Sequence, residues 1–177
     1  MAPPRFEPER ILAVLRRHEV SFVVIGGLAA LAHGSPFPTG DVDVTPARDE
    51  ANLGRLSEAL RELEARVWFS ESEEPPPFAH DAASLAAGRV WNLATTYGRL
   101  DLSMEPDGTH GYPDLAAGAT AVDVLGVVVP VASLADVIRS KQAANRPKDQ
   151  RVLPVLREIL ASRYAHEDRG PAGSGSR

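Results

Sequence analysis

Two aspartates separated by a single residue are the first feature of this sequence that could do chemistry. Asp41 and Asp43 lie in the run DVDVT, where polar and apolar residues alternate. On a strand, side chains two residues apart point to the same face, so these two carboxylates would lie side by side. Two carboxylates this close repel each other unless a cation lies between them. Magnesium, or manganese in its place, suits the pair because hard ions take oxygen ligands and are often shared with substrate phosphates.

A third acid, Asp101, lies between Leu100 and Leu102 on another predicted strand. If the two strands are neighbours, three carboxylates converge. Two metal ions held there could clamp the attacking and leaving oxygens of an in-line displacement. We therefore expect Asp41, Asp43 and Asp101 to be the metal-binding and catalytic residues, with Glu105 as a competing candidate for the third position.

A pair of glycines follows the apolar run SFVVI at residues 21–25 and precedes an Ala- and Leu-rich stretch that reads as a helix. Glycines allow a phosphate to approach the backbone closely, and a helix N-terminus offers free N–H donors and partial positive charge. Gly26 and Gly27 are therefore predicted to bind the phosphates of a nucleotide.

The segment from Phe22 to Val44, FVVIGGLAALAHGSPFPTGDVDV, resembles the signature of the nucleotidyltransferase superfamily, which has the DNA polymerase β-like fold. That signature is an apolar strand, Gly-Gly or Gly-Ser, about ten residues, and then Asp-x-Asp or Asp-x-Glu. A second stretch, LADVIRSKQAANRPKD, resembles the C-terminal helices of small bacterial members, including abortive-infection toxin-like proteins. The resemblance implies that the nucleotide-binding set also includes Thr39, Lys141, Lys148 and Asp149.

Two positions depart from the pattern of the family. Many members carry Ser at the second glycine, where its hydroxyl contacts phosphate, but this chain has Gly27. Many small members have Arg in the loop two residues before the Thr, where this chain has Phe37. The loss of a cation beside the phosphates would reduce activity or change the substrate.

The resemblance implies a magnesium- or manganese-dependent enzyme that moves a nucleoside monophosphate from a nucleoside triphosphate to an acceptor and releases pyrophosphate. The acceptor is open: tRNA, a protein side chain, or a small molecule such as an aminoglycoside. The alternative is a catalytically degenerate member that binds nucleotide or a partner protein, for example one half of a toxin–antitoxin pair with its cognate antitoxin. A haloacid dehalogenase-like phosphatase is disfavoured because a loop, GSPFPTG, precedes Asp41 where that class needs an apolar strand.

The elements that must position these residues follow from hydrophobic periodicity and turn signals. Helices are predicted at residues 8–19, 28–33, 49–66, 133–144 and 147–164, the last with Pro154 inside it. Strands are predicted at 21–25, 41–45, 67–70, 89–96 and 99–104, with one or two more within 122–129, and a loop at 71–77. The order predicts an α+β (α/β-like) chain: a small mixed sheet flanked by helices, with helices at the C-terminal end.

Composition limits the alternatives. The 177 residues fit a single nucleotidyltransferase-like domain at 1–164, with 133–164 as its C-terminal helical part. Residues 165–177 are Gly, Ser and charged residues without an apolar anchor, which predicts a disordered tail. Hydrophobic residues make up 44% and charged residues 24%, as in ordinary globular proteins.

Charge and cysteine content exclude further classes. The chain has no cysteine, so disulfides and thiolate metal sites are excluded. A formal net charge of −5 argues against a protein that coats nucleic acid non-specifically, although a local basic groove remains compatible with it. The sequence contains neither an apolar run long enough for a membrane helix nor a signal peptide, so we expect a cytoplasmic protein with no membrane partner.

Overall fold

A mixed sheet is the centre of the computed structural model, which describes residues 5–68 and 80–167. In the described part of the chain the sheet has seven strands in the order β3-β4-β5-β2-β1-β7-β6. The pairs β1–β7 and β2–β5 are parallel and the other neighbours are antiparallel. The strands are β1 (Phe22–Ile25), β2 (Asp41–Pro46), β3 (Arg66–Val67), β4 (Val90–Thr95), β5 (Gly98–Ser103), β6 (Thr120–Val124) and β7 (Val127–Val131). The predicted α+β class with a mixed sheet is confirmed.

Strand β2 has the alternation expected from its sequence. Val42 and Val44 are fully buried in the core, while Asp41 and Asp43 are partly exposed on the opposite face. The strand lies between β1 and β5, and its parallel register with β5 sets Asp43 directly opposite Asp101. The sheet therefore brings together acids that are far apart in the sequence.

Helices pack against the sheet through apolar residues at helical spacing. In α1, Ile11, Leu12 and Leu15 have no exposed surface. Three of the described helices begin at side-chain caps, where Asp49 accepts from the Asn52 amide, Asp81 from the Ser84 amide and Ser133 from the Asp136 amide. The helices are α1 (Pro8–Arg17), α2 (Gly26–Ala32), α3 (Glu50–Glu62), α4 (Ala82–Ala87), α5 (Tyr112–Gly118), α6 (Leu134–Ala144) and α7 (Pro147–Glu167).

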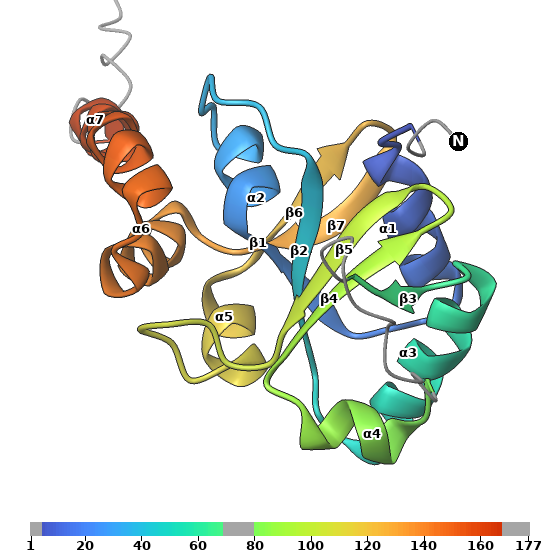
Figure 1. Cartoon of the computed structure of the whole chain (residues 1–177). Coiled ribbons are helices and arrows are strands. Elements are labelled where there is room, and N and C mark those ends of the chain that lie inside the picture. The colour runs from blue at the N-terminus through green and yellow to red at the C-terminus, as the bar shows by residue number, and fades with distance from the viewer. Residues whose placement is uncertain (1–4, 69–79, 168–177) are drawn as a thin grey trace, which may run out of the picture.

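The last two helices lie at one side of the sheet, whereas α1, α3 and α4 lie at the other (Figure 1). Near its C-terminal end, α7 is joined to the end of α2 by a contact between Arg163 and His33. Arg163 donates to the His33 carbonyl at 3.0 Å and contacts the His33 Nδ1 at 3.1 Å. Because a guanidinium only donates, Nδ1 accepts, and the His33 Nε2 donates to the Ala132 carbonyl at 2.7 Å.

The structure corrects several predicted boundaries. Gly26 and Gly27 form the first turn of α2, so this helix begins two residues before the predicted start. Helices α4 and α5 were not predicted, because each is short and offers too few apolar residues for a periodic pattern. Helix α7 passes through Pro154 and ends at Glu167, so residues 165–167, predicted to belong to the tail, are helical. The predicted loop at 71–77 and the rest of the tail lie outside the described residues.

Among residues 5–68 and 80–167, no helix combines the length and the apolar character that a membrane crossing requires.

Candidate active site

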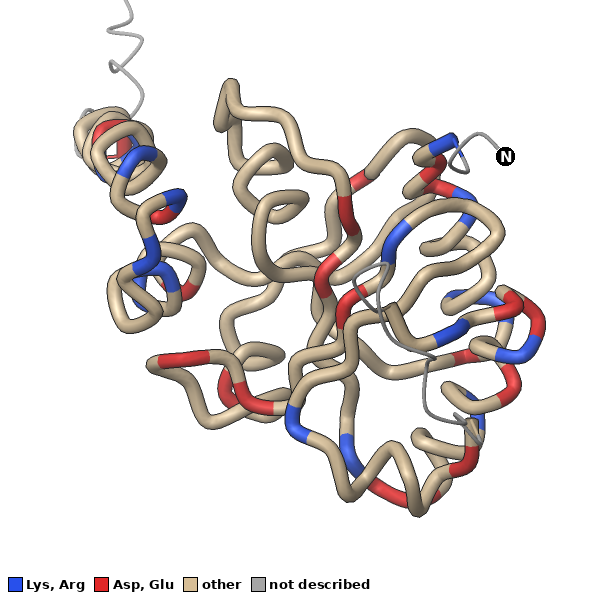
Figure 2. The backbone as a smooth tube through the Cα atoms, in the orientation of Figure 1, with Lys and Arg blue, Asp and Glu red and all other residues tan. Residues whose placement is uncertain are grey.

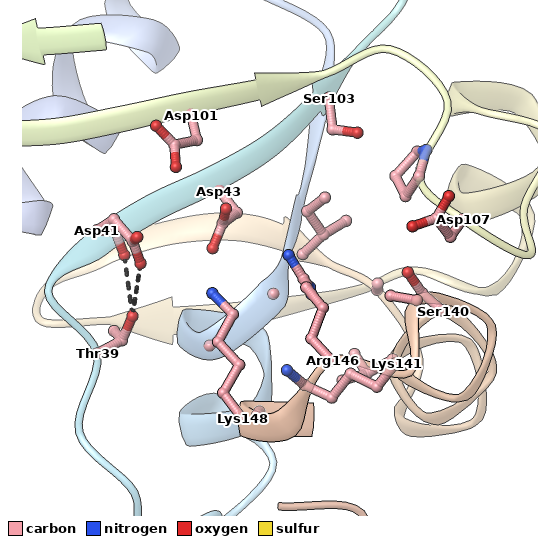
Figure 3. A pocket seen from close by; sticks show the side chains of 18 of the residues that line it. Thr39, Asp41, Asp43, Asp101, Ser103, Asp107, Ser140, Lys141, Arg146 and Lys148 are labelled. Atoms are coloured by element: carbon pink, nitrogen blue, oxygen red, sulfur yellow. Dashed lines mark hydrogen bonds between the residues drawn. The ribbon is translucent and has the colours of Figure 1, made fainter. Parts of the chain in front are cut away.

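Three carboxylates from two adjacent strands form the centre of the site. One oxygen from each of Asp41, Asp43 and Asp101 lies within 4.8 Å of the others. Figure 3 shows the three side chains pointing into one cavity, Asp41 and Asp43 from β2 and Asp101 from β5. The sheet register produces this convergence, because β2 and β5 are parallel and set residues 43 and 101 side by side.

Two of the three carboxylates have raised pKa values. Burial, followed by the charges of Asp41 and Asp101, raises the pKa of Asp43 from its ordinary 3.8 to about 7. Burial also raises the pKa of Asp101, although Arg99, whose guanidinium lies 3.5 Å from its carboxylate, opposes the shift. Lys148 lowers the pKa of both acids, so its ammonium is close enough to act on them. Carboxylates that resist ionisation together are a site for positive charge.

The three residues fit a divalent cation. Their donors are all hard carboxylate oxygens, the type that magnesium and manganese prefer. The Asp101 Oδ1 is buried and has no hydrogen-bond partner among the described residues. A buried oxygen without a partner is costly, and a cation beside it would satisfy it.

Both glycines make room for side chains of the site. Gly26 has a φ of +64°, and a Cβ on it would lie 2.7 Å from the Asp43 Cγ. A Cβ on Gly27 would lie 2.7 Å from the Thr39 Oγ1. The Gly27 amide donates to the Asp43 carboxylate. The N-terminus of α2 is thus packed closely against the acids.

Basic residues of α6, α7 and the turn between them line the other side of the same cavity, which has a volume of about 710 Å³. Lys141, Arg146 and Lys148 lie across from the carboxylates in Figure 3. In Figure 2 basic positions gather where α6 runs into α7, and acidic positions lie on the central strands. The cavity therefore offers a cation-binding wall and an anion-binding wall facing each other.

Asp149 forms ion pairs with two of these basic side chains. Its carboxylate is fully buried, accepts from Lys141 at 3.2 Å and from the Arg146 Nε at 2.7 Å, and is not among the residues that line the cavity. Burial would raise its pKa, but the hydrogen bonds from Arg146 and Lys141 outweigh burial and lower it. Lys141 is 9% exposed, so it is not a solvated helix residue.

The structure brings most of the predicted site residues together. The cavity is lined by Gly26, Gly27, Thr39, Asp41, Asp43, Asp101, Lys141 and Lys148. Glu105 also lines the cavity but does not belong to the carboxylate cluster. Phe37 lines the cavity too and is 39% exposed.

Three further lining residues were not predicted as site residues. Arg146 is one of a basic group visible in the sequence, but nothing in its spacing separates it from its neighbours. Asn92 lies opposite Asp101 in the β4–β5 register, and Ser103 lies two residues beyond Asp101. Alternation along β5 could have identified Ser103, because residues two apart share a face.

Comparisons by sequence find no matching family model and no matching curated protein. Comparison of structures finds three informative likenesses. A protein of Thermotoga maritima with a provisional nucleotidyltransferase assignment is 19% identical, with a TM-score of 0.50, over 90% of this chain and 97% of that chain. The antibiotic-resistance factor ANT(2'')-Ia is 17% identical, with a TM-score of 0.53, over 92% and 93%.

The third is the lincosamide antibiotic adenylyltransferase LnuA, solved with bound lincomycin. It is 12% identical, with a TM-score of 0.58, over 88% of this chain and 99% of that chain. All three likenesses span nearly the whole of each chain. The chain therefore has the nucleotidyltransferase fold.

Proposed function

We propose that this protein transfers a nucleoside monophosphate from a nucleoside triphosphate to an acceptor hydroxyl. The observation that carries the proposal is the cavity itself, in which three carboxylates face Lys141, Arg146 and Lys148. A triphosphate with its divalent cation has the complementary arrangement of charge. The cation is attracted to the acids and the phosphate oxygens to the basic wall.

The basic wall would bind and orient the triphosphate. Lys141 and Arg146 are held in place by the buried Asp149, so little side-chain freedom is lost when phosphate binds. Lys148 lies close enough to Asp43 and Asp101 to place a phosphate between itself and the acids. Phe37 stands at the position where many sequences that resemble this one carry a loop arginine. Arg146 lines the same cavity and supplies positive charge there.

The acids would hold magnesium or manganese, which when bound supplies positive charge to the phosphate and to the attacking oxygen. Asp101 would accept the proton of the acceptor hydroxyl, because its Oδ1 is unpartnered and burial raises its pKa. The acceptor oxygen forms a bond to the α-phosphorus while the bond from that phosphorus to the bridging oxygen breaks. Pyrophosphate leaves with the electron pair.

The acceptor would enter beside Asp101, where Asn92, Ser103 and Glu105 line the cavity. Two proteins of similar fold are an antibiotic adenylyltransferase and an antibiotic-resistance factor. Antibiotic hydroxyls, including those of aminoglycosides, are therefore the first acceptors to test, followed by tRNA and protein side chains.

The test combines binding with transfer. Each α-labelled nucleoside triphosphate is incubated with magnesium and with antibiotics, tRNA or cell protein in turn. Wild-type protein is expected to label one acceptor class, and the double variant Asp41→Asn, Asp43→Asn is expected to lose metal-dependent triphosphate binding measured by calorimetry. Unchanged metal-dependent binding in the double variant would show that the site is assigned wrongly.

The third acid and the non-catalytic alternative are separated in the same assays. Asp101→Ala is expected to remove transfer while triphosphate affinity stays within a few-fold, because Asp101 acts mainly on the acceptor. Loss in Glu105→Ala instead would transfer that role to Glu105. Triphosphate binding by wild type without transfer to any acceptor would favour the nucleotide- or antitoxin-binding alternative, which the substitution of Phe37 for arginine makes worth testing.

A further inference from the structure

The Thr39 hydroxyl bridges two parts of the site that the chemistry above treats separately. Thr39 lies in the loop before β2, and its Oγ1 donates to the Asp41 Oδ1 at 2.9 Å (Figure 3). The Asp41 carbonyl is also near, at 3.3 Å. Hydrogen bonds to a carboxylate are stronger than those between neutral groups, so the shorter contact is the one that fixes the hydroxyl.

Gly27 leaves the space that the Thr39 hydroxyl occupies. A Cβ on Gly27 would lie 2.7 Å from the Thr39 Oγ1 and 3.0 Å from the Thr39 Cβ, distances at which one side chain must move. The backbone of Gly27 donates to Asp43 at the same time. One residue of α2 thus contacts Asp43 directly and Asp41 through Thr39.

Asp41 needs such a contact more than a solitary acid would. Three carboxylates within 4.8 Å repel one another, and Asp41 is only partly buried, so its side chain can turn toward solvent. A donor on one carboxylate oxygen opposes that rotation and leaves the other oxygen available to the cavity. In the described residues, the hydrogen bond from Thr39 provides that donor.

We propose that Thr39 is a positioning residue for Asp41, and that residue 27 must be glycine because the Thr39 hydroxyl lies over it. The inference rests on the proposed function, since it assigns Asp41 to a metal site. It differs from the role suggested by sequence resemblance, in which Thr39 binds nucleotide directly. The two roles separate cleanly, because a positioning residue affects metal affinity and a direct ligand affects nucleotide affinity even without metal.

The experiment measures Mn²⁺ binding by calorimetry, with and without a non-hydrolysable α,β-methylene triphosphate analogue. Thr39→Val removes the hydroxyl at nearly constant volume, and Thr39→Ser keeps it. The matched control is Thr45→Val on the following strand, β2, because the Thr45 Oγ1 is buried without a partner among the described residues. We expect Thr39→Val to weaken Mn²⁺ binding about tenfold, equivalent to about 1.4 kcal/mol. Thr39→Ser should restore most of the affinity, and Thr45→Val should leave it unchanged.

A second comparison tests the coupling to α2. Gly27→Ala should weaken Mn²⁺ binding in the wild-type background, because the added methyl displaces Thr39. The same change should have little further effect in a Thr39→Ala background, where no hydroxyl remains to displace. Additive effects of the two substitutions would overturn the coupling.

Each result has one meaning. Wild-type Mn²⁺ affinity in Thr39→Val would overturn the positioning role and leave the proposed function standing. Equal loss of analogue binding in Thr39→Val with Mn²⁺ and with chelator present would make Thr39 a direct nucleotide ligand. A wild-type protein that binds Mn²⁺ but transfers no nucleotide would overturn the proposed function, while the binding data would still decide the role of Thr39.

Discussion

Asp43 combines two environments that both oppose its charge. It is largely shielded from water, and the carboxylates of Asp41 and Asp101 lie beside it. Its pKa of about 7 means that the metal-free site keeps one proton near neutral pH. A divalent cation bound there as proposed would compete with this proton, and metal binding should release it.

The folded state should consequently lose stability as the pH rises. In the unfolded chain Asp43 ionises near its ordinary pKa of 3.8, whereas in the folded chain it ionises at about 7. The folded state binds more protons between these values, so the free energy of unfolding falls from pH 4 to pH 7. The loss is up to about 4 kcal/mol, at about 1.4 kcal/mol per pKa unit.

Urea denaturation of metal-free protein across pH 5–8 measures this slope. Asp43→Asn should flatten it and should be more stable than wild type at pH 8, and saturating Mg²⁺ should flatten it in wild type. The exposed Glu158→Gln is the matched control and should keep the wild-type slope. A slope that persists in Asp43→Asn would assign the proton to another group.

Residue types and local spacing were enough to predict Asp41 and Asp43 as candidate site residues, because they are two apart on a strand and two glycines precede a helix. Asp101 was identifiable as a strand acid, but its distance from Asp43 depends on the β2–β5 register, which no local pattern encodes. For Asp149, sequence resemblance and structure indicate different roles. Resemblance assigned it to nucleotide binding, yet burial and two cations make it a support for Lys141 and Arg146.

At the scale of elements, the sequence predicted the strands well because β-branched residues alternate or cluster there, as in Phe22–Ile25. It missed α4 and α5, because about two turns with few apolar residues are too short to establish a period. It also predicted α3 to Arg66, but the chain turns at Leu63, and residues 66–67 pair with β4 instead. The pairing of residues 66–67 with β4 therefore outweighed the helical pattern of the local sequence.

The junction between β1 and α2 leaves no room for a side chain at Gly26. Gly26→Ala places a methyl group into Asp43 at a φ of +64°, a conformation that costs non-glycine residues about 1–2 kcal/mol. We expect this variant to lose at least that much stability and to bind Mn²⁺ more weakly, because Asp43 must move. Chemical denaturation and calorimetry measure the two effects.

Gly54→Ala is the matched control for that prediction. Gly54 lies inside α3, and a Cβ there meets nothing within 4 Å. This substitution should stabilise the protein by about 0.5–1 kcal/mol and should leave Mn²⁺ binding unchanged. Similar behaviour of the two variants would mean that the β1–α2 turn is not constrained as described.

At the scale of the molecule, the acids belong to the sheet and the cations to the α6–α7 unit beside it. The width of the cavity depends on how that unit sits against the sheet. The contact of Arg163 with His33 fixes α7 near its C-terminal end, far along the helix from Lys148. At 1.5 Å per residue, a helix separates these two positions by about 22 Å.

Arg163→Met should therefore loosen α7 and weaken triphosphate binding without touching the cavity. We expect faster amide exchange in the second half of α7 and a several-fold rise in the triphosphate dissociation constant, with Mn²⁺ affinity unchanged. Arg157→Met, at an exposed position of the same helix, is the control. Unaltered exchange and binding in Arg163→Met would show that α6 alone places the cations.

The division of the site between sheet and terminal helices also sets the order in which it is made on the ribosome. All three acids have been synthesised once β5 is complete, but Lys141, Arg146 and Lys148 follow only after α5, β6 and β7. At roughly 5–20 residues per second, the nascent chain carries its acidic wall for several seconds before any basic wall exists. If the proposed function is correct, the residues for the metal are thus synthesised before most of the residues for the nucleotide.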